Sequence, residues 1–239
     1  MKATIKSRRS VYMQSLRSWV PGMIVTIAAL ASPVAAQYPP LSEYMMPQDA
    51  EIALAKSGAP ANISDRATIK VLTTSGYKVA REGENGFVCM VMRGWTGPTY
   101  TPANLRNLVY DAKLRAPICF DPKASRSVMP YYELRTKLGM EGKTPDQIAE
   151  GVQAAYDKGQ LPKRDSVSFA YMWSADQELG QAGHWHPHMM VFAPYYDNSM
   201  LGSPEFGRGV PLVTDDAGTP FALIVIPVED RLAVKAQLK

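Results

Sequence analysis

Stretches of alternating apolar and polar residues occupy both ends of the chain, and a helical period lies between them. Residues 67–93 hold three apolar stretches, which are separated by Ser75-Gly76 and by Gly83–Gly86. Alternation with turn residues between the stretches predicts a β-meander with two hairpin turns. Three later segments are also predicted to be strands: 167–173, 188–193 and 221–228. The last of them is the most apolar, which predicts a central position in the sheet.

The middle of the chain carries a strong helix signal in TPDQIAEGVQAAYDKGQ. Thr144 is placed to cap the helix, Pro145 opens it, and Gln147 completes a capping box. Gly159 provides the C-terminal stop. Other helices are predicted at 47–56, at 103–114 and after Pro122, with a break or restart at Pro130. Strand blocks around a helical middle predict an α+β fold, a single domain with a mainly antiparallel sheet.

The first 36 residues have the pattern of a secretory signal peptide. They contain five basic residues and no acidic one, followed by the apolar run Met23–Ala31. Val34 and Ala36 provide small residues before a cleavage site predicted after Ala36. The apolar run is shorter than the ~20 residues that span a bilayer. The chain is therefore predicted to comprise a signal peptide (1–36) and a single domain (37–239) that is periplasmic or secreted.

Two export routes are open. Ser7-Arg8-Arg9 resembles a twin-arginine signal, which would export a folded protein. Arg17 and Pro21 separate this pair from the apolar run, and that separation favours general secretion.

The charge balance changes once the predicted signal peptide is removed. The whole chain has 26 basic and 22 acidic residues, and five basic residues belong to the signal peptide. The remaining 21 basic and 22 acidic residues give a net charge of −1, so no nucleic-acid partner is predicted. No second apolar run could cross a membrane, and the mature protein is expected to be soluble.

Cys89 and Cys119 are the two cysteines of the chain, and both follow the predicted cleavage site. Each lies in an apolar, strand-like segment. In an oxidising compartment such an even pair predicts a disulfide. Closing the 30-residue separation would stabilise the fold by roughly 3–4 kcal/mol in the chain-entropy treatment.

The three histidines of the chain, His184, His186 and His188, occupy alternate positions of GHWHPHMM. In a strand they would point to one side, and neutral imidazole is a ligand for zinc, copper and iron. The first and third would start nearly 7 Å apart at a rise of about 3.3 Å per residue. Because Zn–N bonds are about 2.0–2.1 Å long, a flat strand would not easily bring all three to one ion. A bend at Pro187, or two imidazoles with a carboxylate from Asp176, Glu178 or Asp197, forms the more credible metal site.

Aromatic residues accompany the histidines. Trp185, Tyr195 and Tyr196 combine an apolar ring with a polar edge, which suits a small-ligand pocket. They border a long loop rich in Gly, Pro and Asp that separates the last two predicted strands. Long loops without internal structure are often functional. These three residues are the candidate ligand-binding residues, although packing in the core would also account for aromatic side chains here.

Three segments resemble a group of uncharacterised exported bacterial proteins: GYKVAREGENGFVCMVMRGW, APICFDPKASRSVMPYY and HPHMMVFAPY. The resemblance implies export and a single domain, and it brings no known activity. We therefore expect an exported soluble protein that binds a small molecule or a transition metal (zinc, copper or iron) through residues 183–202. One alternative is a metal-dependent hydrolase or oxidase. Another is a structural or envelope-interaction protein without catalysis. The sequence assigns no catalytic residue and no oligomeric state.

Overall fold

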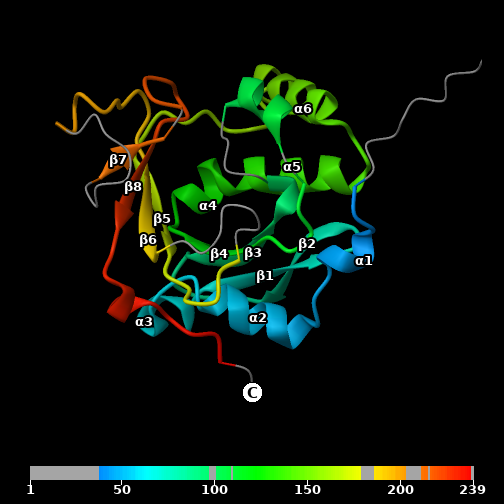
Figure 1. Cartoon of the computed structure of the whole chain (residues 1–239), viewed down its shortest axis with the longest axis vertical. Coiled ribbons are helices and arrows are strands. Elements are labelled where there is room, and N and C mark those ends of the chain that lie inside the picture. Colours follow the sequence, from blue (N-terminus) through cyan, green and yellow to red (C-terminus); the bar gives the residue numbers. More distant parts are fainter. Residues whose placement is uncertain are drawn as a thin grey trace, which may run out of the picture. The chain divides into compact units, whose positions relative to one another are not determined.

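An eight-stranded sheet organises the described part of the chain (Figure 1). The computed structural model describes residues 38–96, 101–108, 110–178, 186–202, 211–214 and 216–237, so the predicted signal peptide lies outside it. The strands are β1 (Thr68–Thr73), β2 (Gly76–Arg81), β3 (Val88–Arg93), β4 (Arg115–Phe120), β5 (Ser168–Met172), β6 (His188–Phe192), β7 (Leu212–Val213) and β8 (Leu223–Pro227). Their order is β2-β1-β3-β4-β5-β6-β8-β7.

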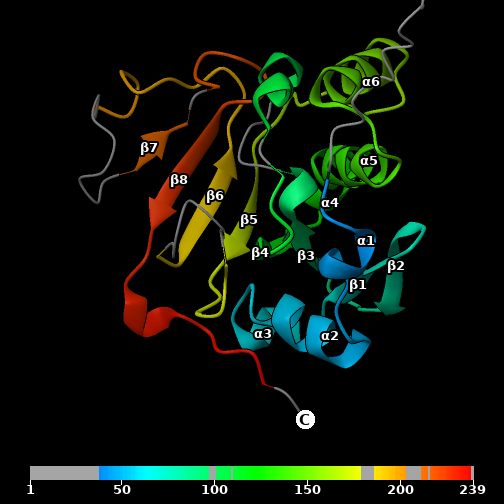
Figure 2. The same cartoon turned by 45° about the vertical axis from the view of Figure 1, so that its right-hand side comes forward.

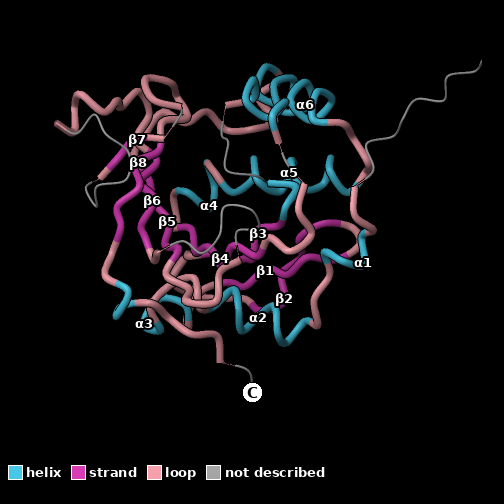
Figure 3. The backbone as a smooth tube through the Cα atoms, viewed as in Figure 1, coloured by secondary structure: helices cyan, strands magenta, loops and turns pink. Residues whose placement is uncertain are grey.

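Helices pack on both faces of the strands β1, β3 and β4. The helices are α1 (Leu41–Tyr44), α2 (Gln48–Lys56), α3 (Ala61–Ser64), α4 (Ala124–Ser127), α5 (Met129–Met140) and α6 (Pro145–Asp157). Short 3₁₀ helices are η1 (Gly94–Thr96), η2 (Pro102–Asn107) and η4 (Asp230–Leu232). Figure 3 shows α2 and α3 on one side of the strands and α4 and α5 on the other, with α6 beyond α5. The predicted α+β fold with a mainly antiparallel sheet is confirmed.

The predicted β-meander is wrong in its second half. β1 and β2 form the expected antiparallel hairpin, but β3 pairs with β1 in parallel, with Ile69 opposite Cys89. After β2 the chain passes back over the start of β1, where Thr68 N donates to Phe87 O at 2.9 Å. Gly83 permits this crossing, because a Cβ there would lie 2.2 Å from Thr68 N. Because β3 lies between β1 and β4, it is an inner strand of the sheet and is almost wholly buried.

The predicted disulfide is confirmed. Cys89 and Cys119 face each other across the antiparallel β3–β4 pair and are bonded through sulfur. Both are fully buried. The bond therefore links two central strands beneath α2.

Local helix signals are largely confirmed. Thr144 caps α6, and the reciprocal hydrogen bonds with Gln147 complete the capping box. Pro130 lies in the first turn of α5, so it restarts the helical stretch. The helix predicted at 103–114 is shorter, because only the 3₁₀ helix η2 forms there.

The main hydrophobic core lies between the sheet and the layer formed by α4, α5 and α6. Antiparallel β5, β6 and β8 run side by side (Figure 2) and supply alternate side chains to this core. They are Ala170, Met172, Met190, Phe192, Leu223 and Val225. The two ends of these strands are therefore the places where buried core meets connecting loops.

Candidate ligand-binding site

The histidine segment lies at one end of the β5–β6–β8 strands. His184 and Trp185 lie outside the described residues. The His186 ring is 75% exposed, and its Nδ1 is 2.7 Å from Asp230 Oδ1 on η4. His188 is the first residue of β6 and is buried, with Nδ1 donating to the His186 carbonyl at 2.8 Å. One described histidine thus faces solvent and the other faces the core.

Burial has a direct effect on His188. It lowers the pKa of the imidazole below its ordinary value, because the charged form loses hydration, and the hydrogen bond to the His186 carbonyl opposes this effect. The bond to that carbonyl also places the proton on Nδ1. His188 is therefore held as a neutral imidazole.

The predicted carboxylate ligands Asp176 and Asp197 are engaged in local structure, and the backbone of Glu178 pairs with that of Arg115. Asp176 Oδ2 accepts from Ala236 N at 2.6 Å and holds the C-terminal segment. Asp197 accepts from Ser199 Oγ and Met200 N, and the Ser199 hydroxyl holds the pKa of Asp197 below its ordinary value. Within the described ranges, no group of three or more His, Cys, Asp or Glu residues is placed to hold a metal ion.

Tyr195 and Tyr196 lie on the loop after β6, and they project outward. They are 60% and 40% exposed. Tyr195 has φ 67°, which makes it the one described residue other than glycine with positive φ. Its N–H donates to Thr219 O at 2.8 Å, and Gly218 N donates to Tyr196 O at 2.8 Å. This loop is therefore fastened to the turn that precedes β8.

A second constellation lies at the opposite end of the same strands, and the sequence did not indicate it. Arg164 stands between α6 and β5 and is only 6% exposed. Its Cζ lies 4.9 Å from the centroid of Tyr131, 4.9 Å from that of Phe221 and 5.8 Å from that of Phe192. We refer to Arg164 with Tyr131, Tyr156, Phe192 and Phe221 as the Arg164 cluster.

The aromatic rings cover the guanidinium group but do not accept ordinary hydrogen bonds from its N–H groups. Nε, Nη1 and Nη2 of Arg164 are all buried, and none makes a hydrogen bond of ordinary geometry with a described residue, although the Tyr156 hydroxyl lies close enough for a contact with Arg164 to oppose the rise in the pKa of that phenol. No described carboxylate forms an ion pair with it either. Contacts with aromatic faces offset about 0.5–2 kcal/mol each, whereas burying an unpaired ion costs several kcal/mol. A buried guanidinium in this state is a candidate for binding a further hydrogen-bond acceptor.

A second buried guanidinium makes this part of the core more positive. Arg135 Cζ lies 4.8 Å from the centroid of Tyr131, and Arg135 Nη1 donates to Tyr131 Oη at 3.1 Å. Burial raises the pKa of Tyr131, the charges of Arg135 and Arg164 lower it, and Asp216 raises it. Two cations and one carboxylate thus act on a single buried phenol.

Sequence patterns gave no reason to select Arg164. It lies in LPKRDS beside Lys163 and Asp165, both exposed, and such a charged loop ordinarily faces water. The only sequence feature that relates to this cluster is the presence of aromatic residues in α5 and at the strand ends. Only the packing of α5 and α6 against the sheet brings those rings to Arg164.

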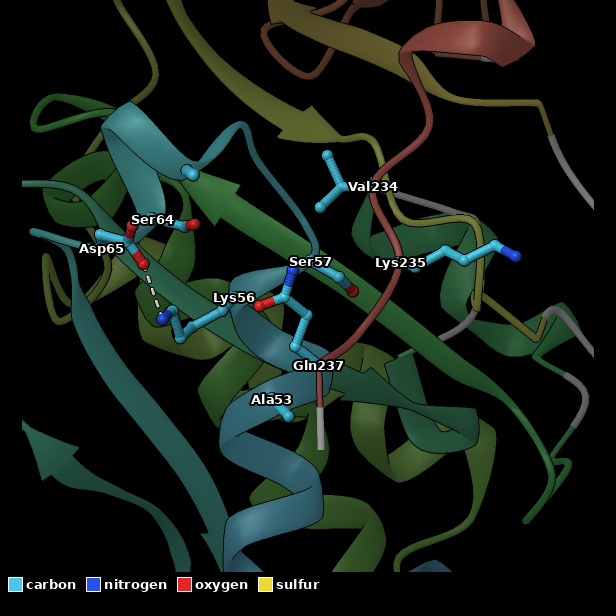
Figure 4. Close-up of a pocket in the computed structure, with 9 residues that line it drawn as sticks. Ala53, Lys56, Ser57, Ser64, Asp65, Val234, Lys235 and Gln237 are labelled. Atoms are coloured by element: carbon cyan, nitrogen blue, oxygen red, sulfur yellow. Dashed lines mark ion pairs between the residues drawn. The ribbon is translucent and has the colours of Figure 1, made fainter. Parts of the chain in front are cut away.

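A separate pocket lies between α2, α3 and the C-terminal segment (Figure 4). On one side Lys56 Nζ pairs with Asp65 Oδ1 at 2.7 Å. On the other, Ser57 Oγ lies 2.6 Å from the buried Ser174 Oγ. Each of these polar side chains therefore has a partner within the pocket wall. The C-terminal segment is also held by its backbone, where Val234 N donates to Trp173 O at 2.7 Å. The contacts around this pocket therefore hold the C-terminal segment against the rest of the domain.

Comparison of the chain with protein-family models, with curated proteins and with solved structures gives no match. In the described part of the chain, every helix is too short or too polar to cross a membrane.

Proposed function

We propose that this is an exported protein that binds a small molecule through an anionic group, with Arg164 as the charge partner. The observation that carries the proposal is the buried guanidinium of Arg164, which has no described carboxylate partner and whose nearest polar neighbour is the Tyr156 hydroxyl, without a hydrogen bond of ordinary geometry. The predicted signal peptide supports export, and the Cys89–Cys119 disulfide is compatible with an oxidising compartment.

The chemistry of guanidinium favours an anion over other ligands. Arginine only donates hydrogen bonds, and its planar fork matches carboxylate and phosphate oxygens. The Arg164 Cζ lies over the rings of Tyr131 and Phe221 at 4.9 Å from each centroid, and neither ring offers an ordinary hydrogen-bond acceptor to its N–H groups. A charge-assisted contact of this kind is roughly twice as strong as a neutral hydrogen bond.

The test is calorimetric titration of the mature chain with acetate, benzoate, inorganic phosphate and sulfate at matched ionic strength. Wild type is expected to bind at least one of these anions at one site, and Arg164→Gln is expected to lose that binding. Lys163→Gln is the matched control, because it removes the same charge from the exposed neighbouring position. Binding that survives in Arg164→Gln, or no binding to any probe, would overturn the proposal.

A second candidate function is transition-metal binding at the histidine segment. The observation that favours it is the His186–Asp230 contact, because a carboxylate on Nδ1 orients the ring and leaves Nε2 for an ion. Zinc, copper and iron content should be measured in protein purified from its native compartment, together with titration by zinc and copper. Stoichiometric metal that is lost in His186→Ala and reduced in Asp230→Asn would support this function.

The other expected functions follow from the outcomes of these tests. A metal-dependent hydrolase or oxidase requires that metal is bound in the first place. If neither an anion nor a metal binds, a structural or envelope-interaction role becomes the stronger hypothesis.

A further inference from the structure

We propose that the C-terminal segment, residues 228–237, occupies a peptide-binding groove, and that the groove takes an extended peptide of a partner protein when this segment is released. The segment follows β8 and runs beside α2 and α3 (Figure 4). Its own contacts define the chemistry of the partner. They are mainly bonds of the main chain, and the groove that receives them is held in place by other residues.

The C-terminal segment binds as an added strand. Val234 pairs in parallel with the stretch that follows β5. Val234 N donates to Trp173 O at 2.7 Å, and Ala175 N donates to Val234 O at 2.8 Å. Two residues further on, Ala236 N donates to Asp176 Oδ2 at 2.6 Å. This is the pattern of strand addition, in which main-chain hydrogen bonds provide the affinity for an extended peptide.

The floor of the groove is fixed independently of the C-terminal segment. Trp173 N donates to Gly58 O at 3.0 Å, just after the end of α2. Ser174 is buried, and its Oγ lies 2.6 Å from Ser57 Oγ. Both contacts join this stretch to α2, and neither involves the C-terminal segment. The main-chain groups that bind Val234 therefore stay in position when the segment leaves.

The C-terminal segment is far less buried than the groove floor. The structure describes all of residues 228–237, and none of them is buried; Leu232 is 39% exposed. Within this segment, Ala236 is the residue that packs against a hydrophobic core cluster. Segments that bury few apolar side chains and depend on exposed main-chain hydrogen bonds open locally, at a free energy below that of global unfolding. The segment therefore leaves the groove while the domain stays folded.

The side chains of the bound segment indicate which peptide fits. Val234 and Ala236 are half-buried, whereas Lys235 and Gln237 are exposed. Figure 4 shows the Lys235 side chain pointing away from α2. Successive side chains of an extended peptide point to opposite sides, so the groove requires a small apolar residue at every second position. The matching partner is an extended stretch of protein in which small apolar and polar residues alternate.

The covalent connection makes the C-terminal segment an intramolecular competitor of the partner. A connected peptide binds with a high effective concentration. A free peptide with the same contacts therefore binds weakly while the segment is in place, and more tightly when the segment is weakened. Val234→Pro weakens it selectively, because proline has no N–H to donate to Trp173 O. Ala236→Pro removes the bond to Asp176 in the same way.

The first experiment is hydrogen exchange of the mature wild-type chain at low urea concentration, followed by NMR. The amides of Ala175 and Val234 are expected to exchange at least about 100-fold faster than the amide of Ala170, because the C-terminal segment opens locally. Ala170 lies in β5, between β4 and β6, and serves as the reference for global unfolding. Exchange of all three amides at the rate of global unfolding would contradict the proposal.

The second experiment is fluorescence anisotropy with a labelled peptide of residues 229–237. Val234→Pro and Ala236→Pro are expected to bind this peptide at least about 10-fold more tightly than wild type does. The matched controls are two peptides, one N-methylated at Val234 and the other at Lys235. Methylation at Val234 removes the N–H that the groove accepts, so binding should be lost. Methylation at Lys235 should leave binding intact, because the neighbouring N–H of a strand points away from this partner.

Each contrary result has a definite meaning. If neither proline variant binds the peptide, or if both methylated peptides bind equally, the groove does not recognise an extended main chain and the proposal is wrong. If both proline variants fail to fold, the C-terminal segment is an integral part of the fold and the proposal is also wrong. If concentrated wild type forms a dimer that Val234→Pro does not form, a second copy supplies the segment, and the proposal of a separate partner is wrong.

Discussion

The guanidinium carbon of Arg164 lies 4.9 Å from the centroid of the Tyr131 ring, and no described carboxylate forms an ion pair with that guanidinium. The two residues come from the segment before β5 and from α5. Each aromatic contact offsets only about 0.5–2 kcal/mol, which is less than the cost of an unpaired buried cation. Under the proposed function, this unpaired charge is a cost to stability of the kind that functional sites commonly carry.

Replacement of Arg164 by methionine is expected to stabilise the anion-free protein. Methionine retains a flexible apolar side chain beside Tyr131 and Phe221 but removes the buried charge. We expect the free energy of unfolding to rise by about 1–2 kcal/mol in urea denaturation without phosphate or sulfate. A loss of more than about 2 kcal/mol would mean that the charge already has a stabilising partner in the fold.

His188 should make the stability depend on pH in the weakly acidic range. Its pKa is lowered in the folded state, so the unfolded chain binds its proton at higher pH. Stability from the neutral ring is complete above the unfolded pKa of about 6.5 and is lost as the pH falls from there toward the folded pKa. Urea unfolding between pH 5 and pH 8 measures this slope.

The variant His188→Gln should flatten that slope, because glutamine does not titrate. The exposed His186→Gln is the matched control from the same segment and should leave the slope as it is in wild type. Equal slopes in wild type and His188→Gln would contradict the assignment of this dependence to His188.

The buried pair formed by Glu51 and Arg93 should be far more sensitive than a surface pair. Arg93 Nη2 lies 2.7 Å from Glu51 Oε1, and both side chains are almost wholly inaccessible. Glu51→Gln leaves the arginine charge buried without its counter-ion, so we expect a loss of about 3–5 kcal/mol in urea denaturation. Glu84→Gln, in the exposed pair with Arg66, should unfold at nearly the wild-type midpoint.

Two helical glycines should respond oppositely to alanine. At Gly139 a Cβ would lie 2.4 Å from Trp95 Cδ1 in the buried stack with Tyr44. Gly139→Ala should therefore destabilise the protein by about 1–3 kcal/mol through overpacking. At Gly151 the nearest atom is a flexible Leu138 methyl carbon at 3.0 Å. There the helix propensity of alanine, worth up to about 1 kcal/mol, should keep Gly151→Ala as stable as wild type or more so. Thermal unfolding of the two variants side by side tests this.

Features that depend on neighbouring residues were predictable from the sequence. The capping box of Thr144 and Gln147, the restart at Pro130 and the alternation in β5 and β6 each follow from a few adjacent positions. The disulfide was also predictable, because two cysteines allow only one pairing within the chain. In each case the decisive interaction is short in sequence or has no competing partner.

Features that depend on pairing between distant segments were not predictable from the sequence. The hairpin expected around Gly83 failed, since alternation shows that β3 is a strand but not which strand it joins. The same limit applied to His186 and His188. Their spacing predicted one shared side, but an irregular segment precedes β6, and the rings face solvent and core respectively.

The sequence by itself determined the α+β class, most of the helices and strands and the cysteine pair, because local backbone preferences and hydrophobic periodicity act over a few residues. Only the tertiary structure decided the order of the strands and the burial of Arg164. A guanidinium in a charged loop becomes a buried cation when Tyr131, Phe192 and Phe221, from three distant segments, close around it. That environment is a property of packing between elements, and no single stretch of the chain encodes it.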